Sequence, residues 1–273
     1  MLKLAGFADE VSPELSQQIA VFKKLGIGAF ELRAVAGKNV LDFDPALRKQ
    51  VKSELADAGL TVACIGSPIG KVKIDEPFGP HLDRFKIAVD SAKFFGAKLI
   101  RLFSYYPPEG GDINRHRDEV IRRFQAKMQI VAGTDLILVH ENERHIFGEG
   151  VANCVDLMKT IDSPQLRSAF DFANFIQAGE DPAKNWPLLK PYTVHIHIKD
   201  AKADGAVVPA GEGVGQIAAI LKDAYLSGYR GFLSLEPHLA AHGQFSGFSG
   251  PQLFESATLA LKKICREIQI PLG

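Results

Sequence analysis

Short runs of β-branched and aromatic residues alternate with longer amphipathic stretches from one end of this sequence to the other. Each run has the length of a strand, and the stretches between them have the apolar spacing of helices that pack on a sheet. We predict strands at residues 3–8, 29–33, 61–67, 99–105, 136–141, 168–172, 193–199 and 231–236. Eight strands with helices between them, in a chain of 273 residues, predict an α/β fold of the (β/α)₈ or TIM barrel kind.

The helical stretches carry start and stop signals that support this alternation. Residues 13–26 and 45–60 open with proline and have glycine in the stop region, and residues 81–96 and 215–228 end on glycine. An open doubly wound sheet is the alternative, but no glycine-rich dinucleotide turn follows the first strand. Because no low-complexity linker or shift in composition divides the sequence, we expect residues 1–273 to form one barrel domain.

Charge and hydropathy exclude several classes of protein. Lys and Arg together number 32, as do Asp and Glu, whereas duplex-binding proteins usually present a basic surface. No apolar run approaches the roughly 20 residues that span a membrane, and the first residues reach an acidic pair too soon for a signal peptide. Three cysteines without CxxC spacing are typical of reduced thiols. We expect a cytoplasmic enzyme with a small-molecule partner, no nucleic acid and no membrane; the oligomeric state, a homo-oligomer included, stays open.

One predicted strand carries polar side chains on a single face. In TVHIHIKDA, residues 193–201, the two-residue period places the apolar side chains on one face and His195, His197 and Lys199 on the other. TIM barrels gather their functional residues at the carboxyl ends of the strands. His197 and Lys199 end this strand. His195 lies deeper, where we expect a core histidine or a residue that supports a ligand.

Four ligand-type side chains end four successive predicted strands: Glu141, Asp171, His197 and Glu236. Three carboxylates gathered in a low-dielectric barrel mouth repel one another, and a divalent cation removes that conflict. Three oxygen ligands with one nitrogen suit one Mn²⁺, Mg²⁺ or Co²⁺ ion, and Zn²⁺ is also compatible. The four residues therefore predict a metal site.

Several stretches, in order along nearly the whole chain, are similar to one family. They are FADEVSPEL (7–15), VHENE (139–143), FDFANF (170–175), HIHIKDA (195–201), PAGEGVGQI (209–217) and GYRGFLSLEPH (228–238). Together they resemble the sugar isomerase/epimerase superfamily of xylose isomerase-like TIM barrels, which includes ketose 3-epimerases, hydroxypyruvate isomerase and inosose dehydratase. The resemblance implies that the same four residues are the metal ligands and that Glu141 and Glu236 are also the catalytic acid–base pair.

The chain departs from the family pattern at two positions. Asn174 stands where many relatives have a histidine three residues after the metal-binding aspartate, and Glu143 stands where many have a histidine after the first glutamate. The first departure weakens an interpretation with a second metal or a second imidazole contact. The second weakens a lyase mechanism that uses that histidine as its base.

The chemistry that we expect is proton abstraction next to a carbonyl. A metal that chelates a hydroxy-ketone acidifies the neighbouring C–H, and a carboxylate then removes the proton to give a metal-bound enediolate. Reprotonation at another carbon isomerises the sugar, and reprotonation from the opposite face epimerises it. Loss of a leaving group from the same intermediate would instead make the enzyme a dehydratase or lyase on inosose or 3-keto-sugar substrates. The sequence leaves these outcomes open.

Further polar residues around the predicted mouth are candidates for substrate binding. They are Lys199, Arg101, Asn174, Lys71, Glu212 and His238. Lys199 and Arg101 also carry the alternative to a metal site, a network of salt bridges in which they neutralise the carboxylates. Glu212 belongs to GEGVG, which we interpret as a loop with its glutamate facing the pocket rather than a phosphate cradle. Residues 239–250, rich in Gly and Ser, have the composition of an active-site cover.

Two other functions are compatible with the same barrel. A DNA-repair endonuclease would need a multi-zinc cluster and a basic surface, and eight histidines with zero net charge count against it. An inactive sugar-binding protein is the third possibility, and the intact set of four ligand-type residues argues against it.

Overall fold

The computed structural model describes residues 1–240 and 247–273 of the chain. Its central strands are β1 (Lys3–Gly6), β2 (Ala29–Leu32), β5 (Thr61–Ile65), β6 (Leu99–Leu102), β7 (Ile137–Glu141), β8 (Leu166–Asp171), β9 (Thr193–Ile198) and β12 (Phe232–Leu235). They close into a parallel barrel in the order β1-β12-β9-β8-β7-β6-β5-β2. The prediction of eight strands in a (β/α)₈ barrel is confirmed.

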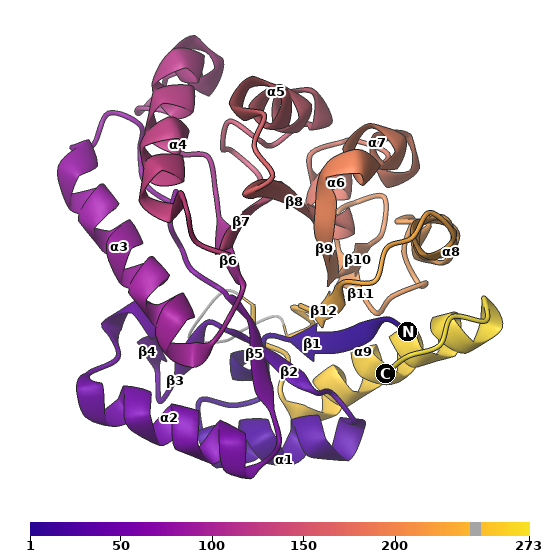
Figure 1. The fold of residues 1–273 in the computed structure, drawn as a ribbon. Coiled ribbons are helices and arrows are strands. Elements are labelled where there is room, and N and C mark those ends of the chain that lie inside the picture. The colour runs from indigo at the N-terminus through magenta and orange to yellow at the C-terminus, as the bar shows by residue number, and fades with distance from the viewer. Residues whose placement is uncertain (241–246) are drawn as a thin grey trace.

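Helices surround the barrel, as Figure 1 shows. They are α1 (Leu15–Leu25), α2 (Pro45–Asp57), α3 (Phe78–Phe95), α4 (Arg117–Val131), α5 (Val151–Ile161), α6 (Phe172–Gln177), α7 (Pro182–Leu189), α8 (Ile217–Leu226) and α9 (Pro251–Glu267). The stop signals act where the sequence places them, since Gly26 ends α1 in the left-handed region at φ 60°. Asp44 begins α2 by accepting hydrogen bonds from the backbone N–H groups of Ala46 and Leu47.

The inner face of the barrel changes from apolar to ionisable along the strands. Leu99, Val139 and Ala169 are buried together, and each lies two residues before an ionisable residue on the same strand: Arg101, Glu141 and Asp171. Because side chains two residues apart share a strand face, the apolar layer and the ionisable layer both point inward. The strands thus place charged groups at their carboxyl ends above an apolar base.

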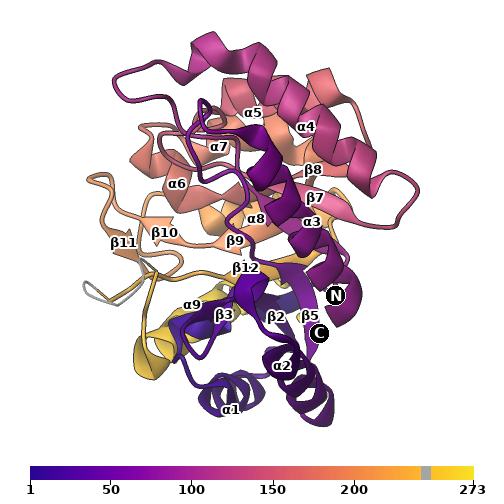
Figure 2. The ribbon, with the colours of Figure 1, turned by 90° about the vertical axis from the view of Figure 1, so that its left-hand side faces the viewer.

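Two short hairpins extend the carboxyl end of the barrel. One pairs β3 (Ala34–Val35) with β4 (Lys38–Asn39), and the other pairs β10 (Asp200–Ala201) with β11 (Val207–Val208). In Figure 2 the β10–β11 hairpin lies on the left and the chain termini lie on the right. The carboxyl ends of the strands and the termini therefore occupy opposite ends of the barrel.

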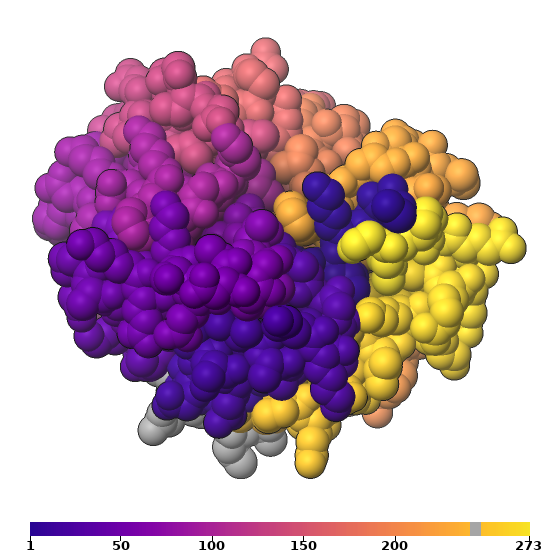
Figure 3. All heavy atoms as spheres, turned by 60° about the horizontal axis from the view of Figure 1, so that its bottom comes forward, coloured from indigo at the N-terminus to yellow at the C-terminus, as the bar shows by residue number. Residues whose placement is uncertain are grey.

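The first and last residues of the chain pair with each other. Leu2 bridges Leu272 in parallel, and the N–H of Leu2 donates to the carbonyl of Pro271 at 3.0 Å. In Figure 3 the indigo surface of the first residues lies beside the yellow surface of the last ones. Within the described residues, no helix combines the length and the apolar character that crossing a bilayer requires.

Candidate active site

The four predicted metal ligands meet at one point. One ligand atom from each of Glu141, Asp171, His197 and Glu236 lies within 4.8 Å of the other three, and all four residues are buried. His197 Nδ1 lies 3.2 Å from Glu141 Oε1, 3.5 Å from Glu236 Oε2 and 4.0 Å from Asp171 Oδ2. The structure thus brings together residues that are up to 95 positions apart, from the ends of β7, β8, β9 and β12.

Hydrogen bonds to neighbouring amides orient two of these carboxylates. Asp171 caps α6, and its Oδ1 accepts from the backbone N–H of Asn174 at 2.7 Å. Asn142 holds the backbone of Asp171 through two 3.0 Å hydrogen bonds. The Asn174 amide donates to Glu141 Oε1 at 3.2 Å. Asn174 therefore positions both carboxylates from one side, and Oδ2 of Asp171 is left facing the centre.

Three cations surround Glu236. Its Oε1 lies 3.3 Å from Arg33 Nη1 and 3.4 Å from Arg101 Nη1, and its Oε2 lies 3.2 Å from Lys199 Nζ. Burial alone would raise the pKa of Glu236, but Lys199 and the neighbouring imidazoles hold that pKa well below its usual range. The surrounding cations therefore favour the ionised form of Glu236.

Lys199 and Arg101 each contact two of the clustered carboxylates. Lys199 Nζ lies 3.0 Å from Asp171 Oδ2 as well as near Glu236, and Arg101 Nη1 lies 3.1 Å from Glu141 Oε2. Burial raises the pKa of Asp171, and the negative charges of Glu141 and Glu236 raise it further, although Lys199 opposes them. This is the salt-bridge network that the sequence offered as an alternative to a metal site. Both interpretations have their residues in place.

Orphaned atoms and donor type decide how well a metal fits. Both ring nitrogens of His197 and Asp171 Oδ2 are buried and make no hydrogen bond of good geometry to any described residue, although Lys199 Nζ lies 3.0 Å from that oxygen. Such orphaned groups are rare in protein interiors unless a ligand or ion completes them. The donor set of three carboxylates and one imidazole is also that of a divalent-ion site. The residues present fit a divalent metal ion.

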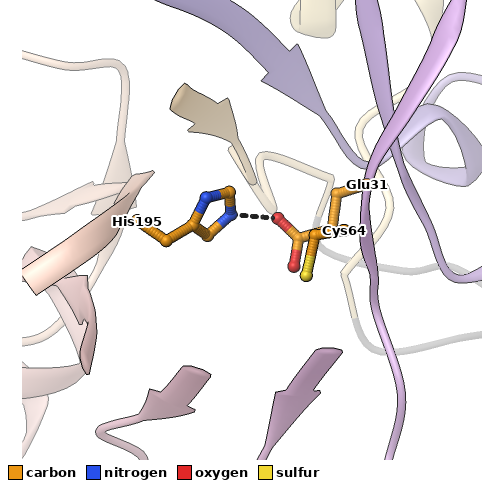
Figure 4. Close-up of side chains that lie close together, drawn as sticks. All are labelled: Glu31, Cys64 and His195. Carbon is orange, nitrogen blue, oxygen red and sulfur yellow. Dashed lines mark hydrogen bonds and ion pairs between the residues drawn. The ribbon is translucent and has the colours of Figure 1, made fainter. Parts of the chain in front are cut away.

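Glu31 lies beneath these four residues and was missed as a site residue. It is the next-to-last residue of β2, is fully buried and lies beside His195 and Cys64 (Figure 4). His195 Nε2 lies 2.7 Å from Glu31 Oε2, and the Ser234 hydroxyl donates to the same oxygen at 2.7 Å. The inward face of its strand was the only sequence signal for this residue. His195 occupies the deeper, supporting position that the strand period predicts.

A second missed group lies at the end of β12. Glu10 is fully buried, and its Oε2 accepts from the backbone N–H of His238 at 2.9 Å and from the Ser249 hydroxyl at 2.8 Å. His238 Nε2 lies 3.3 Å from Glu10 Oε1 and 3.4 Å from Glu236 Oε1. The backbone of His238 has a φ of 48°, a left-handed conformation that few non-glycine residues adopt. Glu10 therefore fixes His238 beside the predicted catalytic glutamate.

A cavity of about 610 Å³ opens above the clustered residues. Apart from Lys71, six of the predicted residues contribute to its lining: Arg101, Asn174, Lys199, His238, Glu141 and Glu236. Lys71 also lines it, and its Nζ lies 2.8 Å from Oε2 of Glu143, the residue that stands in place of the family histidine. Asp9 and Arg33, which are joined by a 2.7 Å ion pair, add to the wall.

Glu212 does not take the position that the sequence suggested. It is exposed and is not among the described residues that line the cavity. The reason is that Asp200, rather than substrate, organises its loop: the Asp200 carboxylate accepts from the backbone N–H groups of Gly211, Gly213 and Gly215 at 2.9–3.2 Å. A side chain on Gly213 would lie 2.3 Å from Asp200 Oδ1. Residues 241–246, within the predicted cover 239–250, lie outside the described residues.

A parallel (β/α)₈ barrel with ionisable, ligand-type residues at the carboxyl ends of its strands defines the class as a TIM barrel with a candidate active site at that end. The sequence matches the xylose isomerase-like TIM barrel family over residues 19–263, and the chain belongs to this family. The family resemblance seen in the sequence motifs is thereby confirmed.

Three known proteins illustrate the relationship. The 3-dehydroshikimate dehydratase of Bacillus anthracis is 20% identical over 146 residues, which are 54% of this chain and 52% of that protein. The match thus spans about half the length of that curated relative. A D-tagatose 3-epimerase-like protein superposes with a TM-score of 0.80 at 16% identity and 98% coverage of both chains. A xylose isomerase-like protein from Mycobacterium smegmatis, solved in complex with magnesium, superposes with a TM-score of 0.76 at 17% identity, covering 98% of this chain and 97% of that one.

Proposed function

We propose that this protein is a divalent-metal-dependent enzyme that isomerises or epimerises a sugar or sugar derivative by moving a proton next to a carbonyl. The observation that carries the proposal is the convergence of Glu141, Asp171, His197 and Glu236 within 4.8 Å, with Glu141 and Glu236 lining the cavity. The family assignment and the epimerase-like structural neighbour support it.

The same four residues would hold the ion. Mn²⁺, Mg²⁺ and Co²⁺ suit this donor set best, and the structural neighbour in complex with magnesium supports a hard divalent ion. A bound divalent ion would polarise the substrate carbonyl and make the neighbouring C–H more acidic.

Glu141 and Glu236 are the proposed proton carriers. They come from β7 and from the residue after β12, both lie near Nδ1 of His197, at 3.2 and 3.5 Å, and both line the cavity. A carboxylate on each side of a substrate carbon lets one glutamate remove the proton while the other returns it to the opposite face. Asn174 holds Glu141 in orientation through its 3.2 Å hydrogen bond.

Lys199 and Arg101 are the proposed contacts to substrate oxygens. Both are buried, both line the cavity, and each carries a positive charge beside the carboxylates. When proton removal places negative charge on the carbonyl oxygen, fixed cations in a water-poor site stabilise that charge strongly. Lys71 and His238, farther out in the lining, would bind the remainder of the molecule.

A dehydratase is the second candidate. The match to 3-dehydroshikimate dehydratase favours it, because dehydration can begin with the same proton abstraction. The two functions differ in the second step, since a dehydratase must also protonate a departing hydroxyl group. His238 and Lys71 are among the cavity residues that could take that role.

Incubation in D₂O tests both candidates at once. Mn²⁺-loaded protein is incubated with a panel of ketoses, inososes and 3-keto-glycosides, and the products are analysed by NMR and mass spectrometry. Deuterium at one carbon of an intact sugar supports the isomerase or epimerase, and loss of water supports the dehydratase. EDTA-treated protein and a His197→Ala variant should lose deuterium exchange together with the metal. Ser234→Ala is the matched control, and it should keep exchange if it keeps the metal. Full exchange in the metal-free enzyme would contradict the proposal.

A further inference from the structure

We propose that Glu31 is a positioning residue that fixes the imidazole of His197 so that Nδ1, and not Nε2, faces the metal site. The inference rests on the proposed metal site. It adds a function for a residue on β2, which carries none of the four proposed ligands and is separated from β12 by β1.

The geometry places a single oxygen among three donor groups. Glu31 Oε2 lies 3.2 Å from His197 Nε2, 2.7 Å from His195 Nε2 and 2.7 Å from the Ser234 hydroxyl oxygen. All four residues are fully buried. His195 Nε2 is hydrogen-bonded to this oxygen, and His197 Nε2 lies 3.2 Å from it, so one carboxylate oxygen is within reach of both rings.

The chemistry of imidazole then determines which nitrogen is free. A neutral imidazole has one N–H donor and one nitrogen lone pair, and an ionised carboxylate only accepts. The nitrogen beside Glu31 therefore carries the hydrogen, and the lone pair belongs to Nδ1, which faces the oxygens of Glu141 and Glu236. Histidine ligands commonly donate their second ring N–H to a carboxylate, which fixes both the tautomer and the ring orientation.

A second metal site is the competing interpretation of the same region. Ligand atoms of Glu31, Cys64 and His195 also lie within 4.8 Å of one another (Figure 4). However, the 2.7 Å separation of His195 Nε2 and Glu31 Oε2 is that of a hydrogen bond, and Ser234 donates to the same oxygen. We therefore assign this cluster as support for His197.

The test compares substitutions at Glu31 with a control at the same oxygen. Glu31→Leu removes the acceptor, Glu31→Gln keeps one, and Ser234→Ala removes a neighbouring donor but leaves the contact with His197. Calorimetric titration with Mn²⁺ should show affinity lower by about 10–100-fold in Glu31→Leu, the usual cost of losing such a partner, and within a few-fold of wild type in the other two. Circular dichroism and thermal melting of each metal-free variant establish that it folds.

NMR of the histidine side chains supplies a readout that does not depend on affinity. In ¹⁵N-labelled, zinc-loaded protein, His197 should show a slowly exchanging proton on Nε2, and this signal should be lost in Glu31→Leu. If that variant does not fold, the Nε2 proton in wild type and in Glu31→Gln still tests the proposal. Wild-type Mn²⁺ affinity in folded Glu31→Leu, a proton on Nδ1, or a metal content near two would overturn it.

The outcome also separates this inference from the proposed function. Wild-type protein that binds no Mn²⁺ contradicts the metal-dependent function. The exchange rate of the Nε2 proton of His197 in the metal-free protein, compared between wild type and Glu31→Leu, then still reports on the contact with Glu31. Normal Mn²⁺ binding that is insensitive to Glu31 contradicts only the positioning role.

Discussion

Lys199 Nζ lies 3.0 Å from Asp171 Oδ2, so a fixed cation already neutralises one of the carboxylates that we propose as metal ligands. A positive charge beside a divalent ion repels it. We therefore expect Lys199→Met to bind Mn²⁺ at least about threefold more tightly than wild type. That gain corresponds to less than about 1 kcal/mol, which is smaller than the repulsion that the substitution removes. The variant should also turn over substrate more slowly. Lys71→Met is the matched control, because that lysine also lines the cavity but pairs with Glu143. Weaker Mn²⁺ binding by the Lys199 variant would contradict the proposed ligand set.

Replacement of either proton carrier should reduce turnover while leaving the cavity intact. Glutamine at position 141 or 236 keeps the shape and an oxygen ligand but removes the basic carboxylate. We expect each variant to lose about 10²–10⁴-fold in turnover if proton transfer is limiting. Steady-state kinetics must be paired with Mn²⁺ occupancy on the same samples, since lost metal would mimic this effect. A fully metallated variant with wild-type turnover would assign the proton to another group, such as Lys199 or His238.

Removal of the Asp200 carboxylate should destabilise the loop after β9. In Asp200→Ala, the N–H groups of Gly211, Gly213 and Gly215 lose a buried charged acceptor. We expect the free energy of unfolding to fall by roughly 2–4 kcal/mol, because each bond to an ionised group contributes about 1.5–3 kcal/mol and the loop can relax toward water. The free energy of unfolding of Asp200→Asn should lie between those of Asp200→Ala and wild type.

Urea denaturation measures this effect, and a nearby aspartate provides the control. Asp204 also accepts a backbone hydrogen bond, from Ala206 at 3.0 Å, but it is exposed. Asp204→Ala should therefore change stability by less than about 1 kcal/mol. Equal losses in the two alanine variants would show that Asp200 does not organise the loop.

His140 should make the folded protein less stable in mild acid. Burial lowers the pKa of His140 to about 3, with a smaller contribution from Lys127, whereas an unfolded histidine has a pKa of about 6.5. Between these values the unfolded chain binds a proton that the folded chain does not. The contribution of His140 is thus complete above about pH 6.5 and falls by at most about 1.4 kcal/mol per pH unit below it.

Unfolding of metal-free protein at several pH values checks this sign. The difference in stability between wild type and His140→Gln should shrink, or favour the variant, as the pH falls from about 7 to about 5. Ser104, which lies 2.9 Å from His140 Nε2, remains in both proteins. A parallel pH dependence in the two proteins would assign the acid sensitivity to other groups.

Local patterns were sufficient to predict the barrel and the four clustered residues. A strand reveals its inward face by its two-residue period, and a parallel barrel brings the carboxyl ends of its strands together. Glu141, Asp171, His197 and Glu236 each end a strand, so their convergence is a result of topology alone. Among the predicted helices the largest differences were the start of α3, at Phe78 instead of residue 81, and the end of α2, at Asp57 instead of residue 60.

Contacts across the barrel could not be predicted in the same way. The register of β2 against β5 shifts between Phe30 and Glu31, and that of β8 against β9 shifts between Ser168 and Ala169. Such irregularities change which inward side chains meet, and local sequence does not report them. The contact between Glu31 on β2 and His195 on β9 depends on the registers of these two strands in the barrel. The prediction that Glu212 faces the pocket was wrong because Asp200, 12 residues earlier, holds the loop.

The four clustered residues all come from the later strands, whereas the earlier strands and their loops contribute other residues to the cavity. All four lie between positions 141 and 236, on adjacent strands, whereas Arg33, Lys71 and Arg101 reach the cavity from the earlier strands and their loops. A designer could therefore graft new loops after β2 and β5 to change which molecule is accepted and retain the groups that move the proton. Glu31 on β2 must be kept in such an exchange, and a chimaera that retains Glu31 should bind Mn²⁺ with unchanged affinity.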